Sequence, residues 1–120
     1  MRDHKKLRAF ELADRLALAV YQATRQFPVD ERFGLTSQLR RAAVSVPSNI
    51  VEGCARSTEA DYLKFLDIAL GSACEVEYQL SLAKRLEFMS DAEYASAGQI
   101  ASEAARVLNG LIRSIRDRPT

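Results

Sequence analysis

RRAAVSVPSNIVEGCAR, residues 40–56, is the stretch that decides the fold. Its apolar and small residues recur every three or four positions, as in a helix with one buried face. Pro47 interrupts this stretch, where it removes one helical hydrogen bond and crowds the carbonyl of Ala43. Because the apolar period continues across the proline, we expect one helix over 35–56, kinked at Pro47. Two helices broken at Pro47 are the alternative.

Three other segments have the same helical period. Pro28 stops the first of them, since proline disfavours helical geometry in the residue before it. Thr58 with Asp61, and Ser90 with Glu93, have the spacing of capping boxes and mark where the third and fourth helices begin. The connections are short, so helices adjacent in sequence should run antiparallel. The sequence therefore predicts an all-α protein, a single domain over 1–120 folded as an antiparallel up-down-up-down four-helix bundle, with helices over 6–27, 35–56, 58–87 and 91–117.

The composition is that of an ordered chain that can bury one core. Of the 120 residues, 48% are hydrophobic, and the formal net charge of +1 argues neither for nor against nucleic acid. No apolar run is long enough to span a membrane, and the basic start MRDHKKLRAF lacks the apolar region of a secretory signal. We therefore expect a cytoplasmic protein with no membrane partner.

Residues that carry catalysis or bind metals are scarce. His4 is the only histidine, which excludes the paired Glu-x-x-His motifs of di-iron bundles, the common Cys/His zinc sites and His-dependent catalytic sets. The five glycines are isolated, so no phosphate-binding loop is predicted. Cys54 and Cys74 would lie ~20 Å apart in a helical hairpin, too far for a disulfide, and are expected to be two small buried thiols. The sequence thus predicts no enzymatic activity and no metal or cofactor.

The second and third helices each have residues outside their core stripe that a plain bundle does not need. Around the second helix, a narrow polar sector adjoins a second apolar side, although one apolar side suffices for the core. On the third helix, Gly71 and Ser72 would let a neighbouring backbone approach closely. These features predict a subunit interface between copies of the chain, formed by Arg41, Val44, Ser45, Pro47, Ser48, Asn49, Val51, Glu52, Ile68, Gly71, Ser72 and Glu75.

The charges in this predicted interface have candidate partners across the two helices. Antiparallel pairing places Glu75 beside Arg40 or Arg41, and Glu52 beside residues 63 and 64. In one interpretation these are solvated surface charges, worth about 0–1 kcal/mol each. In the other they are buried between subunits, where each charge needs a partner. The second interpretation is favoured, because apolar and small residues flank the charges on both helices.

Basic residues gather near both chain ends. In an up-down four-helix bundle the two termini emerge at one end, so their charges would combine there. Contacts to the phosphates of RNA or DNA need only such a density of lysine and arginine. Solubilising charge and complementation of the helix dipole are the alternative explanation. The candidate nucleic-acid contacts are Arg2, Lys5, Lys6, Arg8, Arg113, Arg116 and Arg118.

The block ERFGLTSQLRRAAVSVPSNIVEGCAR, residues 31–56, resembles the signature of the four-helix-bundle proteins encoded by 23S rRNA intervening sequences. Residues 65–88 resemble the same family's second block, and residues 7–27 fit its first helix. The resemblance implies assembly as a homopentamer around a central axis. It also suggests a relation to the accessory variability proteins of diversity-generating retroelements, which are pentameric bundles that bind nucleic acid and a reverse transcriptase. No catalytic residues carry over, and the family name by itself implies no ribosomal role.

Together these features predict a non-enzymatic bundle that assembles into a ring-shaped homo-oligomer, a homopentamer, and acts as a scaffold or adaptor with affinity for RNA or DNA. A purely protein-binding oligomer without nucleic-acid contact is the alternative. A third hypothesis is an enzyme or small-molecule binder that uses a pocket on the ring axis.

Overall fold

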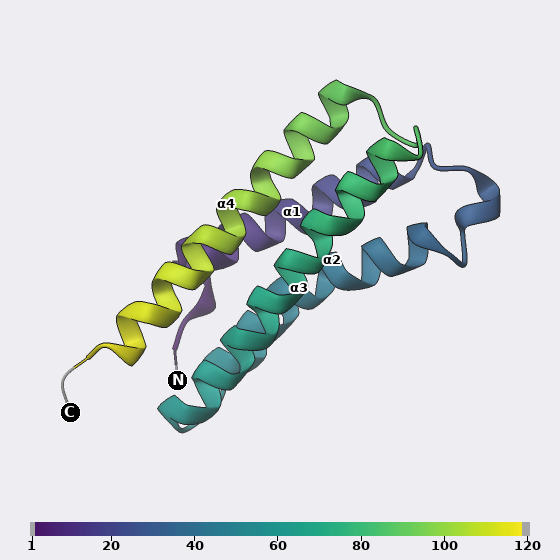
Figure 1. Cartoon of the computed structure of the whole chain (residues 1–120). Coiled ribbons are helices and arrows are strands. Elements are labelled where there is room, and N and C mark those ends of the chain that lie inside the picture. Colours follow the sequence, from purple (N-terminus) through teal and green to yellow (C-terminus); the bar gives the residue numbers. More distant parts are fainter. Residues whose placement is uncertain (1, 119–120) are drawn as a thin grey trace.

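The computed structural model of the protein describes residues 2–118, and four α-helices and two short 3-10 turns account for its secondary structure in that range (Figure 1). Helices adjacent in sequence run antiparallel, and α1 and α3 each pack against both α2 and α4. The predicted all-α four-helix bundle is therefore confirmed. It is 50 Å long and 23 by 19 Å across. The elements are η1 His4–Lys6, α1 Arg8–Thr24, η2 Val29–Glu31, α2 Leu35–Cys54, α3 Glu59–Arg85 and α4 Asp91–Arg116.

The helices are one to three residues shorter at most ends than the sequence predicted. α1 begins at Arg8 because Leu7 is extended, with φ −91° and ψ 128°, and so separates α1 from η1. Thr24 ends α1, and its hydroxyl donates to the carbonyl of Val20 at 2.7 Å. Phe27 is buried, as its place in the apolar stripe indicated, but it lies in the turn that follows the helix.

α2 runs through Pro47 as one continuous helix. The alternative of two helices broken at the proline is therefore wrong, while the bend expected at Pro47 stays a prediction. Two residues further on, the side-chain amide of Asn49 donates to the backbone carbonyl of Ser45 at 2.7 Å. This bond gives the helix an additional side-chain contact beside the position where proline has no N–H to donate.

Both predicted caps are present. Ser90 and Glu93 form a complete capping box, because each backbone N–H donates to the other side chain, at 2.9 and 3.1 Å. The bond from the Ser90 backbone lowers the pKa of the Glu93 carboxyl, since it favours the charged form. At the start of α3, the backbone N–H of Asp61 donates to the Thr58 hydroxyl at 3.1 Å, which is one half of a capping box.

The apolar stripes read from the sequence form the core. All seven predicted core positions of α2 and all seven of α3 are buried. The predictions for α1 and α4 were less accurate. Ile112 is buried although it was not predicted, whereas several predicted core residues are only half-buried, namely Phe10, Ala17, Tyr94, Ile100 and Leu111.

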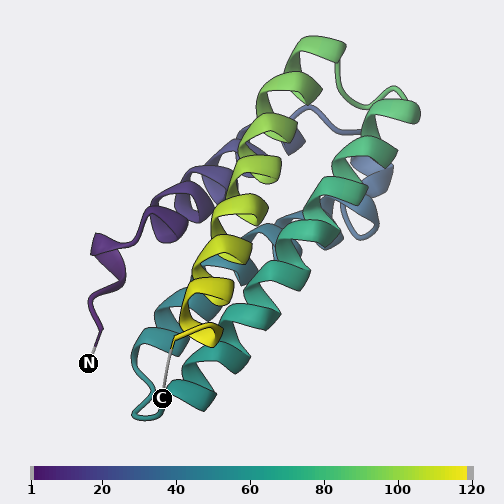
Figure 2. The same cartoon turned by 60° about the vertical axis from the view of Figure 1, so that its left-hand side comes forward.

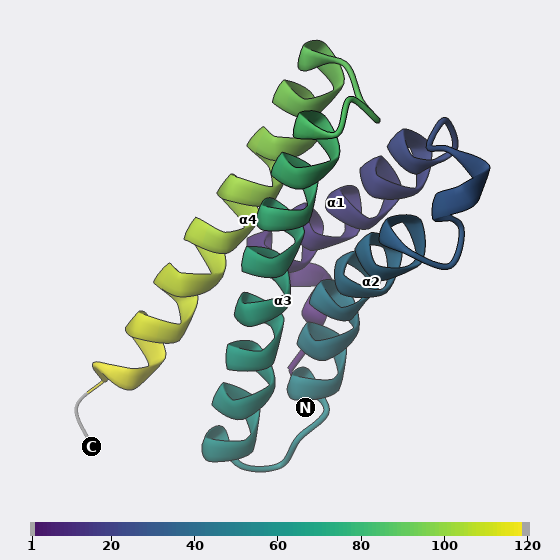
Figure 3. The ribbon, with the colours of Figure 1, turned by 45° about the vertical axis from the view of Figure 1, so that its right-hand side comes forward.

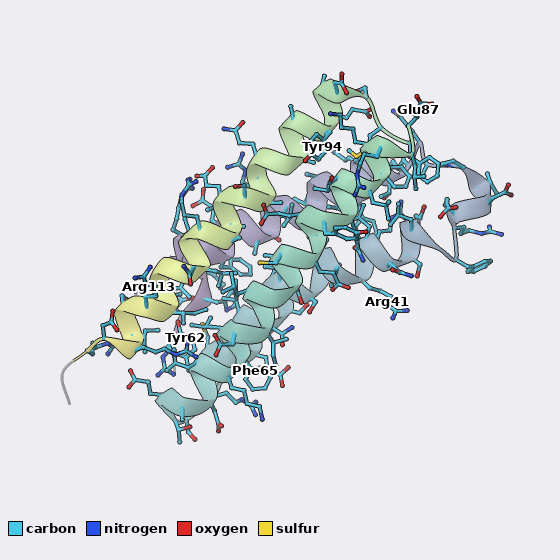
Figure 4. The ribbon with its side chains drawn as sticks, viewed as in Figure 1. Arg41, Tyr62, Phe65, Glu87, Tyr94 and Arg113 are labelled. Atoms are coloured by element: carbon cyan, nitrogen blue, oxygen red, sulfur yellow. The ribbon has the colours of Figure 1, made fainter. Side chains whose placement is uncertain are left out.

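α3 ends in a Schellman motif that uses an unfavourable residue. The N–H of Phe88 donates to the carbonyl of Ala83, and the N–H of Glu87 donates to the carbonyl of Lys84, both at 2.9 Å. This geometry requires a left-handed residue at Glu87, whose φ is 65° (Figure 4). Glycine is the usual choice there, because it has no Cβ to strain.

Glu87→Gly is accordingly expected to raise the free energy of unfolding by about 1 kcal/mol. Urea denaturation at one fixed protomer concentration measures the change. Arg85→Gly is the control. Arg85 is the last helical residue of α3, so glycine there should instead lower the free energy of unfolding, by about 1 kcal/mol. A Glu87→Gly variant that is no more stable than the wild-type chain would contradict the strain at this position.

Candidate subunit interface

A polar bridge joins α2 to α3 in the middle of the bundle. The hydroxyls of Ser45 and Ser72 lie 2.8 Å apart, and the Asn49 amide donates to the Ser45 hydroxyl at 2.9 Å. Figure 3 shows the two helices side by side along this line. All three side chains are half-buried within one protomer. Three residues of the predicted interface therefore already have polar partners inside the chain.

A groove with a volume of about 470 Å³ lies between the two helices, from this bridge toward the start of α2. Arg41 and Glu75 stand on its two walls, and Arg41 points away from the bundle (Figure 4). Both side chains are exposed. The lining residues are Phe33, Ser37, Gln38, Arg41, Ala42, Ser45, Ser72 and Glu75.

The charge pairs expected between the two helices do not form within the protomer. Among residues 2–118, none of the ion pairs within 4.0 Å joins α2 to α3. Arg40 turns the other way, toward α1, where its Nε donates to the Thr24 hydroxyl at 2.7 Å and its guanidinium lies 4.5 Å from the ring of Tyr21. Arg41 and Glu75 are thus without an ion-pair partner in the described part of the chain.

Apolar residues on the outward side of α2 and α3 are exposed. Val44, Val51 and Ile68 are 39%, 38% and 44% exposed, as expected for a second apolar side without a partner inside the chain. With the polar residues between them they form the outer α2–α3 face, which comprises Arg41, Val44, Ser48, Val51, Glu52, Ile68, Gly71 and Glu75. Exposed apolar side chains gathered on one side of a helix pair mark a candidate contact with another molecule.

Gly71 lies on this face without a packing reason inside the protomer. A Cβ built there would meet no heavy atom within 4 Å. Glycine in the interior of a helix costs about 1 kcal/mol relative to alanine, and here nothing in the bundle offsets that cost. Gly53 differs, because a Cβ there would lie 3.0 Å from the Cβ of Phe65. Of these two glycines, only Gly53 is explained by the contact between α2 and α3.

The two cysteines have opposite environments, which corrects the prediction that both are buried. Cys54 is 1% exposed, and burial raises the pKa of its thiol; burial likewise raises the pKa of the neighbouring Tyr62 hydroxyl. Cys74 is exposed, and both thiols are free. Cys74 lies three residues after Gly71 on α3, so its thiol borders the outer α2–α3 face.

Arg2 and Arg118, the two ends of the described chain, lie at the end of the bundle that carries the turn between α2 and α3 (Figure 2). There the N–H of Arg2 donates to the carbonyl of Cys54 at 3.2 Å. The Arg2 guanidinium lies 4.0 Å from the ring of Tyr62 and donates to the carbonyl of Arg56 at 3.3 Å. The prediction that both termini emerge at one end of the bundle is confirmed. The contacts of Arg2 hold the N-terminal segment against α2 and α3.

Carboxylates neutralise three more of the seven predicted nucleic-acid contacts. The ion pairs are Arg8 with Glu11 and Glu103, Arg116 with Asp67, and Arg118 with Glu59. Lys5, Lys6 and Arg113 are exposed and form no ion pair in the described part of the chain. The terminal end therefore presents less free positive charge than its sequence indicated.

Two residues beside the predicted interface were missed. Tyr78 is 60% exposed and continues the outward stripe of α3 by one turn beyond Glu75, so a helical wheel would have included it. Phe33 is 87% exposed at the rim of the groove. The sequence feature that could have identified Phe33 is an aromatic residue in an otherwise charged connection.

Within residues 2–118, no helix combines the length and the apolar character needed to cross a bilayer. In the same residues, no three side chains of His, Cys, Asp or Glu gather in a way that would hold a metal ion.

The class of protein defined by these features is an antiparallel four-helix bundle with one unpartnered outer face. The chain belongs to the 23S rRNA-intervening sequence protein family, whose pattern residues 5–110 match. It is also similar to a protein of unknown function from the S23 ribosomal protein family of Bacteroides thetaiotaomicron, known from a crystal structure. The TM-score is 0.81 and the sequence identity 25%, over 88% of this chain and 95% of the other. No curated protein sequence matches the chain.

Proposed function

We propose that the protein is a non-enzymatic scaffold that assembles with copies of itself through the outer α2–α3 face, forming a ring-shaped homopentamer. The observation that carries the proposal is Gly71, whose missing side chain leaves open space on an exposed helix flanked by Ile68 and Glu75. The approach of another backbone to this position would offset the cost of glycine in the helix.

The charges on the outer face support the same proposal. Arg41 and Glu75 have no ion-pair partner within the described residues. A second copy can therefore provide a partner for each without breaking an existing ion pair. Contact between different surfaces of adjacent copies closes into a ring when the rotation between the copies permits it. The resemblance to pentameric bundles, including the accessory variability proteins of diversity-generating retroelements, sets the expected number of copies at five.

Light scattering tests the assembly directly. The wild-type chain is expected to have the mass of five protomers of 13.4 kDa, and Arg41→Ala and Glu75→Ala are each expected to lower it. Arg106→Ala and Asp14→Ala are matched controls, since both side chains are exposed on α4 and α1 and form no ion pair within residues 2–118. A monomeric wild-type chain, or an unchanged mass in both interface variants, would refute the proposal.

Cys74 provides a second reading of the same contact. Its thiol is exposed in the protomer, while Cys54 is buried, so the two cysteines report different events. Alkylation of Cys74 by a maleimide is expected to be slow in the assembly and fast in a dissociated variant such as Arg41→Ala. Cys54 should react slowly in both, because only unfolding exposes it. Equal Cys74 rates in assembled and dissociated protein would place this thiol outside the contact.

A nucleic-acid partner is the second part of the proposal, and a purely protein-binding scaffold is the alternative. Arginine and lysine side chains without an ion-pair partner are the observation that favours nucleic acid. The ion pairs of Arg8, Arg116 and Arg118 make the terminal end of the bundle a weak candidate for the binding site. Binding to RNA or DNA should strengthen steeply as salt is lowered. Absence of binding even at low salt would leave the protein-binding alternative.

A further inference from the structure

A second groove lies at the opposite end of the bundle from the chain termini, where α1 ends and α2 begins. Its volume is about 210 Å³, and three arginines, Arg25, Arg32 and Arg40, line it. None of the three forms an ion pair within residues 2–118, in contrast to Arg8, Arg116 and Arg118 at the terminal end. The groove therefore concentrates unneutralised positive charge.

Arg40 is held in place before any ligand arrives. Its Nε donates to the Thr24 hydroxyl at 2.7 Å, and its guanidinium lies 4.5 Å from the ring of Tyr21. A fixed guanidinium loses little conformational freedom when it binds an anion, and its planar array of donors suits phosphate oxygens. Thr36, which is 8% exposed, adds a hydroxyl-bearing side chain to the same wall.

A nearby carboxylate that would compete for these arginines is directed elsewhere. Glu31 accepts a hydrogen bond from the backbone N–H of Leu35 at 3.0 Å and so serves the start of α2. Its carboxylate also borders Gly34, where a Cβ would lie 2.9 Å from Oε1. Asp30 is exposed and forms no ion pair in the described part of the chain.

An exposed aromatic ring lies beside one of these three arginines. Phe33 is 87% exposed, and the guanidinium of Arg32 lies 5.0 Å from its ring. An apolar ring this exposed contributes little to the bundle core. Exposed aromatic rings beside arginines are the usual platform on which the bases of a single strand stack.

We propose that this groove binds single-stranded nucleic acid, with a backbone phosphate among Arg25, Arg32 and Arg40 and an adjacent base stacked on Phe33. The inference deepens the nucleic-acid part of the proposed function and moves the contact to the end where α1 meets α2. One protomer carries all four of these residues. The contacts of Arg40 with α1 give that arginine a structural role. They give no structural role to Arg25, Arg32 or the exposed Phe33.

Fluorescence anisotropy with a labelled oligothymidylate of about 20 nucleotides at low salt tests the site. Arg25→Ala/Arg32→Ala is expected to bind at least roughly tenfold more weakly, with the slope of log affinity against log salt reduced by about 0.7 for the loss of one phosphate contact. Phe33→Leu is expected to bind roughly tenfold more weakly with the slope unchanged. Lys5→Ala/Lys6→Ala loses the same charge at the other end of the 50 Å bundle and should change affinity less than about twofold.

Each outcome separates this site from the broader proposal. A wild-type chain that binds no strand at low salt would refute the nucleic-acid proposal and this site together. Equal weakening by the two double variants would overturn the site while nucleic-acid binding stands, and an unaffected Phe33→Leu would overturn the stacking. Competition by polyglutamate as strong as by unlabelled oligothymidylate would overturn the nucleic-acid assignment in favour of an acidic protein partner. Circular dichroism and light scattering on every variant exclude misfolding or a changed assembly as the cause.

Discussion

Gly71→Arg is expected to leave the protein as single protomers that are more stable than the wild-type protomer. The added side chain meets nothing within the chain, and arginine favours the helix over glycine by nearly 1 kcal/mol. In the assembly, the same side chain would bring bulk and an unpaired charge into a close contact between backbones. Such a charge should weaken each contact by about two to three orders of magnitude in dissociation constant. Light scattering over a dilution series measures the loss.

Gly110→Arg is the matched control for this variant. Gly110 lies on α4, it is exposed, and a Cβ there also meets no heavy atom within 4 Å. The arginines at 106 and 113 would repel the new side chain by only a few tenths of a kcal/mol. Gly110→Arg should therefore keep the wild-type mass. If both variants keep it, Gly71 is not at a subunit contact; if both lose it, the effect is not specific to the outer face.

Gly53→Leu is expected to lower the free energy of unfolding by about 3 kcal/mol or more, because α3 lies directly against α2 there. Even an alanine Cβ would lie 3.0 Å from the Cβ of Phe65 and 3.3 Å from the carbonyl oxygen of Tyr62. Tyr62 and Phe65 both come from α3 (Figure 4). Because the two atoms belong to the backbone of that helix or are bonded directly to it, they cannot move without shifting the helix. Urea denaturation at a fixed protomer concentration measures the loss.

Alanine at the two glycines of this hairpin should have opposite effects. Gly53→Ala is expected to destabilise by about 1–2 kcal/mol, since overpacking outweighs the gain in helix propensity. Gly71→Ala should stabilise the protomer by nearly 1 kcal/mol, since only propensity changes there. A Gly53→Ala variant as stable as the wild-type chain would show that α3 can shift to accept the methyl group.

The core of the bundle was predictable residue by residue where one helix face is enclosed. All predicted core positions of α2 and α3 are buried, from Leu35 to Gly53 and from Tyr62 to Ala83. Period alone suffices there, because α2 and α3 share the most extensive helix–helix contact of the bundle. At α4 the wheel missed Ile112, since apolar residues flank the stripe and the sequence does not say which side turns inward.

The candidate site was predictable only in its outline. The second apolar side of α2 was read correctly, because Val44 and Val51 fall outside the stripe that fills the core. The direction in which each charged side chain points could not be predicted, because spacing along an antiparallel hairpin does not distinguish adjacent residues of one helix. Arg40 and Arg41 were interchangeable partners for Glu75 in the sequence, yet Arg40 binds Thr24 on α1.

The sequence by itself determined four helices, their antiparallel order, their caps and their inward faces, because these follow from local periodicity, backbone preferences and short connections. Only the tertiary structure decided which charges are neutralised, since ion pairs such as Arg8 with Glu103 join residues distant along the chain. It likewise decided that Gly53 fills a tight contact while Gly71 faces open space, a distinction that exists only once α3 lies against α2. RRAAVSVPSNIVEGCAR therefore specifies a helix with two faces, and the packing of the other helices decides which face is left outside.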